Sequence, residues 1–385
     1  MLLPMIRRSL HTGHRTLSRA TKLHHHISPP NLSFEQEYSI RSSLERLITD
    51  YSQKDIPQIS LNSLISLSRE PPITNGLASV NYLTTFNAKR LQAFRQLPYI
   101  VVLNPHIAET YNLYLKSLEL LLNLHRVEDT DKIYQTLTKF SEIHSDAIPS
   151  LSKGFQEVST FFPKEEIVKF LNAHFRDKIN METMTNNFIQ SINAPENHMG
   201  IVNTKLKISD LVHIFAGFVN DMTFIKYYKQ VPVKIDFGED IEFPYIAPHL
   251  EYVFTEILKN SIRAHIENDR ADSPVLVTIV ENSTIQGKRT LGIRFRDEGG
   301  GIPPEIEQHI FDYSFTSVEK QEKQSGMGDN VMPGEDVDNV AGMGYGLPLT
   351  KAYVEQFGGR LELQSCYGLG TDVYVELIGP DNSLL

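Results

Sequence analysis

A glycine-rich run that leads directly into a helix is the feature that most constrains this chain. The segment GMGYGLPLTKAYVEQFGG, residues 342–359, places three glycines within five residues ahead of a short helical pattern. Glycines let the backbone approach a ligand closely, and a helix N-terminus presents free N–H groups and partial positive charge to phosphates. The run favours a nucleotide ligand, but a single glycine-rich loop does not establish one.

A helix with one charged face is expected upstream, in HLEYVFTEILKNSIRA, residues 249–264. Its apolar residues recur every three or four positions, which indicates one buried stripe. The stripe consists of Leu250, Val253, Phe254, Ile257, Leu258 and Ser261. Glu256, Asn260 and Arg263 share an adjacent polar face. An amide oxygen one turn beyond a carboxylate suits Mg²⁺ shared with phosphates, and the carboxylate can deprotonate a hydroxyl. The alternative is an ordinary helix with a solvated face.

Two further glycine motifs lie between and beyond these segments. LGIRFRDEGGGIP, residues 291–303, places Asp297 at the end of a strand, directly before Gly299, Gly300 and Gly301. LELQSCYGLGTDVYVEL, residues 361–377, is typical of two strands joined by a glycine turn. Four such segments in this order are far more specific than any one of them.

The order E-x-x-x-N-x-x-R, D-x-G-G-G, G-x-G-x-G-L and G-x-G-T-D resembles the ATP-binding domain shared by gyrase-type ATPases, heat-shock chaperones, histidine kinases and mismatch-repair ATPases. Within that superfamily, ILKNSIRAHIE, FRDEGGGIP, FDYSFTS and GLGTDVYVEL closely resemble the mitochondrial 2-oxoacid dehydrogenase kinases. These are the pyruvate dehydrogenase kinases and the branched-chain 2-oxoacid dehydrogenase kinase. The resemblance is dense over residues 251–377 and thinner upstream. It implies an α+β fold, with an N-terminal four-helix bundle followed by an α/β sandwich ATP-binding domain.

The chain divides by composition into three parts. Residues 1–34 are basic, with no acidic residue before Glu35, which is typical of a mitochondrial transit peptide; a disordered basic tail is the alternative. Residues 35–195 show helical periodicity interrupted by prolines and are expected to form the bundle domain. Residues 196–385 are expected to form the ATP-binding kinase domain. The resemblance and the transit peptide together imply the mitochondrial matrix.

The bundle departs from histidine kinases at the position of their phosphoacceptor histidine. Asn187 and Phe188 stand where that histidine would be sought, so a phosphohistidine relay is disfavoured. Direct transfer of the phosphoryl group to a protein hydroxyl, or simple hydrolysis of ATP, remains possible for this chain. The nearby His174 and His198 are expected at the surface.

Composition excludes several other classes of protein. A formal charge of -10 disfavours nucleic acid as a main partner, and no run of about twenty apolar residues predicts a membrane span. The single cysteine, Cys366, excludes an intrachain disulfide framework and a cysteine-based metal cluster.

The resemblance assigns roles to residues of the pocket. Glu256 corresponds to the general base, and Asn260 to the Mg²⁺ ligand that bridges phosphate oxygens. Lys259 and Arg263 are expected to add positive charge near the phosphates, with a surface ion pair as the alternative for each. Asp297 is expected to accept from the adenine amino group. A histidine precedes the base by one turn in some relatives, and here that place holds Tyr252.

The remaining expected contacts surround the nucleotide. Gly299 and Gly301 would keep the adenine wall thin, and Thr371 would complete its floor. A polar, glycine-rich segment between the motifs is expected to order as a lid when ATP binds. The expected lid and triphosphate contacts are Thr316, Ser317, Gly342, Met343, Gly344, Tyr345, Gly346 and Leu347. The resemblance also implies K⁺ held by the backbone carbonyls of Ile310, Asp312 and Phe315.

The implied function is a protein serine kinase that uses Mg-ATP to phosphorylate and inactivate the alpha subunit of the pyruvate dehydrogenase complex. A kinase of the branched-chain complex, a motor-like ATPase and a nucleotide-sensing scaffold with little transferase activity remain open. The implied partners are the dehydrogenase alpha subunit, a lipoyl domain of the acyltransferase core, and a second kinase subunit in a homodimer or in a heterodimer with a related kinase. The chain has no tryptophan, so exchange of an Asp-Trp tail between subunits is not expected.

Overall fold

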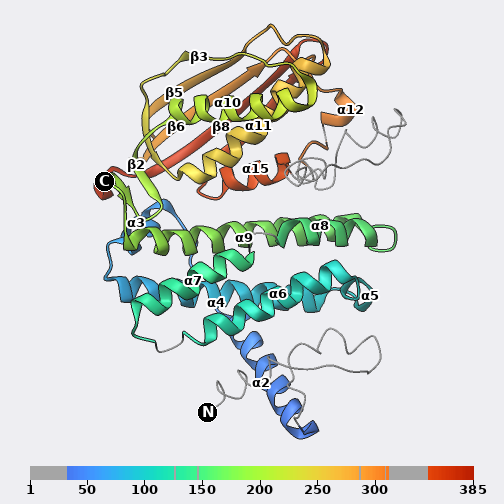
Figure 1. The fold of residues 1–385 in the computed structure, drawn as a ribbon, viewed down its shortest axis with the longest axis vertical. Coiled ribbons are helices and arrows are strands. Elements are labelled where there is room, and N and C mark those ends of the chain that lie inside the picture. The colour runs from blue at the N-terminus through green and yellow to red at the C-terminus, as the bar shows by residue number, and fades with distance from the viewer. Residues whose placement is uncertain (1–32, 125–126, 145–146, 286–287, 308, 312–345) are drawn as a thin grey trace. The chain divides into compact units, whose positions relative to one another are not determined.

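The computed structural model describes residues 33–124, 127–144, 147–285, 288–307, 309–311 and 346–385 (Figure 1). By contacts the chain forms two compact units, with residues 70–193 in the first and 194–385 in the second. Residues 33–58 belong to the first unit, whereas residues 59–69 belong to the second. The helical periodicity of residues 35–195 instead predicts that this segment belongs to the helical domain.

The first unit is entirely helical in its described part. It comprises α2 (Phe34–Ser52), α4 (Pro72–Gln96), α5 (Tyr99–Val102), α6 (Pro105–Leu122), α7 (Thr130–His144), α8 (Ala147–Val158) and α9 (Lys164–Ile192). The helices α4, α6, α7 and α9 pack together as the expected bundle. Prolines mark helix starts, because their fixed φ suits a first turn whose N–H groups have no intrahelical acceptor. At the start of α6, the Asn104 side chain accepts from the backbone N–H groups of His106 and Ile107.

The expectation of a surface position for His174 is wrong. His174 is fully buried, because it shares the stripe of Leu171 and Phe175 on α9 and packs 5.5 Å from the Tyr114 ring. Burial lowers the pKa of His174 well below its ordinary value, so the ring is neutral. Asn187 is also fully buried, which leaves that position closed to a phosphoacceptor role.

The second unit is a two-layer sandwich. Its main sheet has the order β3 (Val233–Phe237), β5 (Val275–Ile285), β6 (Lys288–Asp297), β8 (Gly370–Asp381) and β7 (Arg360–Cys366). Only the β3–β5 pair is parallel among these described strands. The helices α10 (Ile208–Tyr227), α11 (Ala247–Glu267) and α15 (Gly346–Glu355) cover one face (Figure 1). The α+β fold predicted from the sequence is confirmed.

Smaller elements complete this unit. A second sheet has the order β1 (His198–Met199), β2 (Val202–Lys207) and β4 (Glu242–Tyr245). The unit also contains two short helices, α12 (Pro304–Glu307) and the 3-10 helix η2 (Asn382–Leu384). The helix α3 (Leu61–Ser68) packs on this unit, and one of its side chains pairs with the end of β8. Asn62 donates to the Asp381 carboxylate at 2.6 Å and accepts from the Asp381 N–H at 2.9 Å.

The predicted apolar stripe of α11 forms the core beneath the sheet. Leu250, Val253, Phe254, Ile257 and Leu258 are each at most 1% exposed. The Phe254 ring packs 5.4 Å from that of Phe295 on β6. With this face buried, the charged face of α11 turns toward α15, which packs beside it.

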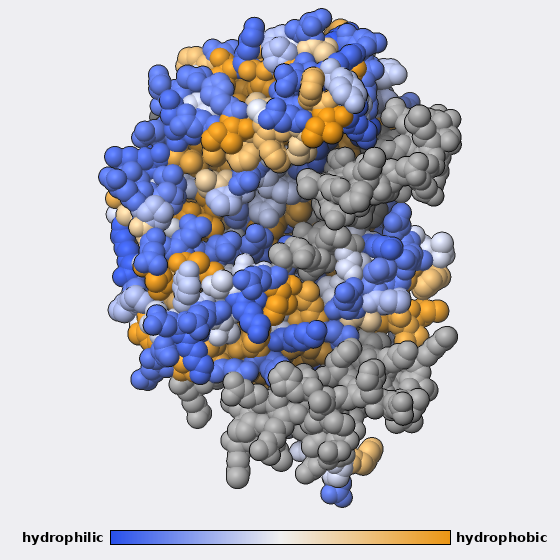
Figure 2. Space-filling model, viewed as in Figure 1, coloured by the Kyte–Doolittle hydropathy of each residue, from blue (hydrophilic) through white to orange (hydrophobic). Residues whose placement is uncertain are grey.

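The helix α10 carries an apolar outer face. Ile214, Phe218 and Ile225 are exposed on it, and Figure 2 shows hydrophobic residues gathered over this part of the second unit. By length and composition alone α10 meets the criterion for a membrane span. Its opposite side, with Val212 and Val219 buried, packs on α11 and β3, as expected of an amphipathic helix of the sandwich.

Candidate active site

The carboxylate of Glu256 and the first residue of α15 are in direct contact. A Cβ added to Gly346 would lie 2.3 Å from Oε2 of Glu256, so any other residue at this position would displace the Glu256 carboxylate. Glu256 is only 8% exposed, and its Oε1 lies 2.5 Å from Nζ of Lys259. The helix motif and the last glycine of the run therefore meet, as the sequence pattern predicted.

The other residues on the polar face of α11 differ in their exposure and in the groups that they contact. Asn260 is exposed one turn beyond Glu256, so its amide is open to a ligand. Arg263 forms an ion pair with Glu267 at 2.6 Å, the surface pairing that the sequence left open for it. Tyr252, one turn before Glu256, packs against Tyr353 of α15 with ring centroids 5.0 Å apart.

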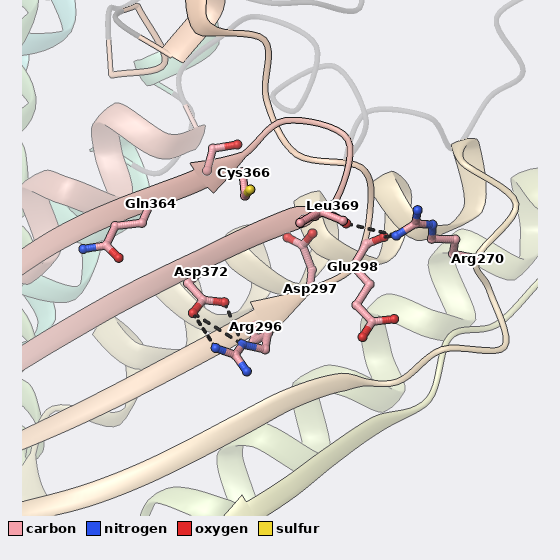
Figure 3. Close-up of a pocket in the computed structure, with 10 residues that line it drawn as sticks. Arg270, Arg296, Asp297, Glu298, Gln364, Cys366, Leu369 and Asp372 are labelled. Carbon is pink, nitrogen blue, oxygen red and sulfur yellow. Dashed lines mark hydrogen bonds and ion pairs between the residues drawn. The ribbon is translucent and has the colours of Figure 1, made fainter.

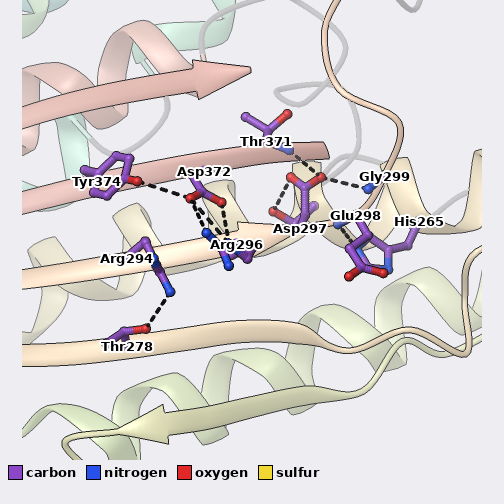
Figure 4. Close-up of polar contacts among 11 residues, drawn as sticks. His265, Thr278, Arg294, Arg296, Asp297, Glu298, Gly299, Thr371, Asp372 and Tyr374 are labelled. Carbon is purple, nitrogen blue, oxygen red and sulfur yellow. Dashed lines mark hydrogen bonds and ion pairs between the residues drawn. The ribbon is translucent and has the colours of Figure 1, made fainter. Parts of the chain in front are cut away.

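Asp297 sits at the end of β6 with its carboxylate held by its neighbours (Figure 4). Its Oδ1 accepts from the backbone N–H of Gly299 at 2.9 Å and of Thr371 at 3.2 Å. Its Oδ2 accepts only a longer bond, from the Ser261 hydroxyl at 3.3 Å, among the contacts described. Burial raises the pKa of Asp297 above its ordinary value, although these hydrogen bonds oppose the shift. The antiparallel register of β6 and β8 places Thr371 opposite Asp297.

Glycines make this close packing possible. A Cβ on Gly299 would lie 2.4 Å from Cβ of Ala264, and one on Gly370 would lie 1.9 Å from the carbonyl oxygen of Asp297. Gly301 has φ +71, and a Cβ there would approach the Cys366 carbonyl oxygen to 2.4 Å. The glycine motif is thus packed closely against α11 and β7 on the Asp297 side of the site.

Substituting Gly299 with alanine should lower the free energy of unfolding by about 1–3 kcal/mol, because the new methyl group overlaps Ala264. It should also weaken ATP binding, since the loop must move away from α11. Urea denaturation and an ATP titration would measure both effects. The control is Gly217→Ala on α10, where a Cβ meets no atom within 4 Å. Stability and affinity equal to wild type in Gly299→Ala would show that the loop is not held as described.

A cavity of about 630 Å³ opens beside Asp297 at this end of the sheet (Figure 3). Its lining includes Arg270, Glu298 and Cys366, and it reaches neither Glu256 nor Gly346. Arg296 in its wall already pairs with Asp372 at 3.1 Å, so that guanidinium is not free for a triphosphate. The cavity therefore adjoins the Asp297 end of the site without enclosing the predicted catalytic groups.

Several predicted contacts lie outside the described residues. They are Asp312, Phe315, Thr316, Ser317, Gly342, Met343, Gly344 and Tyr345. Gly346 and Leu347 begin α15, and Ile310 is buried in a turn after α12.

The sequence assigned no role to three residues at the end of α11 that contact the loop after Asp297. These are His265, Asn268 and Arg270, and each hydrogen-bonds the backbone of Glu298 or Gly299. His265 carried a usable signal, because it follows Ser261 by one turn on the buried stripe. Asn268 and Arg270 lie beyond the periodic segment, where spacing predicts nothing.

Two family models match the chain. Residues 58–203 match the mitochondrial branched-chain alpha-ketoacid dehydrogenase kinase model, and residues 246–380 match the histidine kinase-, DNA gyrase B- and HSP90-like ATPase model. The second match covers Glu256, Asp297, Gly346 and Thr371, so the site lies within an ATP-binding domain.

Three relatives are named for the same activity. The chain is 37% identical to pyruvate dehydrogenase (acetyl-transferring) kinase 1, mitochondrial, of Saccharomyces cerevisiae, over 97% of this chain and 96% of that protein. It is 24% identical to the corresponding mitochondrial kinase of Arabidopsis thaliana, over 83% and 89% of the two chains. It is 27% identical to isozyme 4 of Rattus norvegicus, over 73% and 70%.

Proposed function

The chain belongs to the mitochondrial pyruvate dehydrogenase kinase family, and on that premise we propose that it transfers the γ-phosphoryl group of Mg-ATP to a serine of the pyruvate dehydrogenase alpha subunit. The product would be an inactive dehydrogenase complex. The observation that carries the proposal is the contact between the Glu256 carboxylate and Gly346, which joins a buried base to the end of the glycine run.

Glu256 is the proposed general base. It would accept the proton of the serine hydroxyl as the new bond from oxygen to phosphorus forms and the bond to the ADP oxygen breaks. The ammonium group of Lys259, 2.5 Å from Oε1, holds the carboxylate in place. Because Gly346 lies against Oε2, the start of α15 would present its N–H groups next to this base.

Asn260 is the proposed magnesium ligand, through its exposed amide oxygen. Within the described residues, no group of three or more His, Cys, Asp or Glu side chains could hold a metal by themselves. An exposed amide oxygen suits a Mg²⁺ ion whose other ligands are phosphate oxygens and water. When bound, Mg²⁺ neutralises charge on the phosphates. A K⁺ site at the carbonyls of Ile310, Asp312 and Phe315 is part of the same proposal.

The proposed setting follows from the family. The chain would work in the mitochondrial matrix after loss of residues 1–34, docked on a lipoyl domain of the acyltransferase core. The uncovered face of the main sheet, opposite α11, would pair with a second kinase subunit, identical or related.

A branched-chain 2-oxoacid dehydrogenase kinase is the second candidate function. It is favoured by the match of residues 58–203 to the branched-chain kinase model and by Tyr252 in place of histidine. The relatives that align over most of both chains are named pyruvate dehydrogenase kinases, which favours the first candidate function.

Labelled ATP incubated with the purified kinase and each dehydrogenase complex in turn would test the proposal. We expect label on the alpha subunit of the pyruvate dehydrogenase complex and loss of that complex's activity. Label on the branched-chain complex alone would establish the second function. ATP hydrolysis without a labelled protein would indicate an ATPase, and ATP binding without turnover would indicate a scaffold.

A further inference from the structure

The loop that follows Asp297 is held by three side chains, one from the last turn of α11 and two that directly follow the helix. The Glu298 N–H donates to Nε2 of His265 at 2.8 Å, and the Glu298 carbonyl accepts from Nη1 of Arg270 at 2.8 Å. The Gly299 carbonyl accepts from Nδ2 of Asn268 at 2.8 Å. Since Nε2 of His265 accepts a hydrogen bond, its ring must carry the proton on Nδ1, which faces the Arg270 and Ser273 carbonyls.

The remaining backbone groups of residues 298–300 are bonded as well. The Gly299 N–H donates to Asp297, the Gly300 N–H donates to the Leu369 carbonyl at 3.2 Å, and the Gly300 carbonyl accepts from Gly368 at 2.7 Å. Each of the three residues therefore has both its N–H and its C=O bonded within the protein. Loops usually satisfy many such groups with water. This one is fixed by the chain itself.

Arg270 joins this loop to the turn between β7 and β8. Its Nη1 donates to the Glu298 carbonyl and also to the Leu369 carbonyl at 3.0 Å, and its Nη2 reaches the Gly368 carbonyl at 3.5 Å (Figure 3). A guanidinium presents several donors in one rigid plane, so this side chain reinforces the two backbone hydrogen bonds that join Gly300 to the same turn.

The junction of loop and turn lies beside Asp297. Asp297 precedes the loop and Thr371 follows the turn, and the Thr371 N–H bonds Oδ1 of Asp297 at 3.2 Å. With Oδ1 taking two N–H groups, Oδ2 keeps acceptor capacity beyond its 3.3 Å contact with Ser261. An acceptor oriented in advance binds a donor more tightly, because no ordering is left to occur on binding.

We propose that Arg270 is a positioning residue for adenine recognition. It clamps the loop after Asp297 to the turn before Thr371, with His265 and Asn268 holding the same loop, so that Oδ2 of Asp297 meets the amino group of an adenine nucleotide. The inference rests on the proposed adenine role of Asp297. It adds Arg270 as the residue that orients the Asp297 carboxylate.

The test compares Arg270→Ala with Arg270→Lys in the full-length chain. We expect Arg270→Ala to raise the Kd for ATP about tenfold, which corresponds to the loss of one hydrogen bond between Asp297 and the adenine. The variant should also show a smaller preference for ATP over GTP. The kcat at saturating ATP should stay within about twofold, because Glu256 is untouched. Arg270→Lys should recover part of the affinity through one of the lost donors.

Arg289→Ala is the matched control. Arg289 lies near the other end of β6, donates to the Glu242 carbonyl at 2.9 Å and pairs with Glu281. Its loss removes a carbonyl clamp of the same kind and should lower Tm without changing the Kd for ATP.

Two results would overturn the inference. They are an unchanged Kd for ATP in Arg270→Ala, whatever its kcat, and an equal rise in the Kd for ATP in Arg289→Ala. Asp297→Asn, measured alongside, distinguishes failure of the positioning role of Arg270 from failure of the adenine role of Asp297. If it loses affinity while Arg270→Ala does not, only the positioning role fails, whereas if it keeps affinity the adenine role of Asp297 fails too.

Discussion

Replacing Glu256 with glutamine should leave ATP bound at near wild-type affinity and slow phosphoryl transfer by about 10²–10⁴-fold. Glutamine keeps the volume that packs against Gly346, so the fold of the site should survive. It cannot accept the proton of the attacking hydroxyl. Calorimetric ATP titration and single-turnover phosphorylation of the dehydrogenase would measure the two effects separately.

The control for this substitution lies on the same helix. Glu267→Gln removes a carboxylate that pairs with Arg263 at 2.6 Å and is more than a helical turn from Glu256, so transfer should remain normal. Near-normal transfer by Glu256→Gln would assign the base to another group. Loss of ATP binding together with transfer would instead show that Glu256 is required to bind the nucleotide.

The parts of the site that the sequence predicted are those set by local pattern. The stripe from Leu250 to Leu258 is a matter of helical period, which leaves Glu256 and Asn260 on an adjacent face of the helix. Asp297 at a strand end and Gly346 at a helix start follow from β and glycine signals within a few residues. Each of these depends on neighbours along the chain.

The features that the sequence missed depend on contacts between distant segments. Arg270 bonds residues 28 and 99 positions away, and Asn62 bonds Asp381 across 319 positions, so no spacing rule could find either. His174 was misjudged because a single polar residue on an apolar stripe fits either environment. In the structure, Tyr114 and Phe94 pack around the His174 ring and bury it.

Replacing Asp297 with asparagine should separate binding from stability. The substitution turns the acceptor at the Oδ2 position into a donor, so we expect ATP affinity to fall by about 10–100-fold. At neutral pH the variant should be as stable as wild type, or more so. The buried amide oxygen can still accept from Gly299 and Thr371, and the amide nitrogen can donate to the Ser261 hydroxyl.

The stability effect has a defined dependence on pH. Burial raises the folded-state pKa of Asp297 above the ordinary 3.8, so the folded protein binds this proton more tightly than the unfolded chain. The stabilisation from the bound proton is complete below about pH 3.8 and is lost as pH rises through the folded-state pKa. Asparagine cannot ionise, so its advantage in Tm over wild type should be present at pH 7 and shrink on acidification.

Asp372→Asn is the control for both effects. Asp372 follows Thr371 on β8 and pairs with Arg296 at 3.1 Å, so this variant should lose an ion pair and keep ATP affinity. A drop in Tm at pH 7 with ATP affinity retained in Asp297→Asn would contradict the proposed role. That carboxylate would then act as a structural anchor of the β6–β8 turn, and adenine would have to be recognised by other groups.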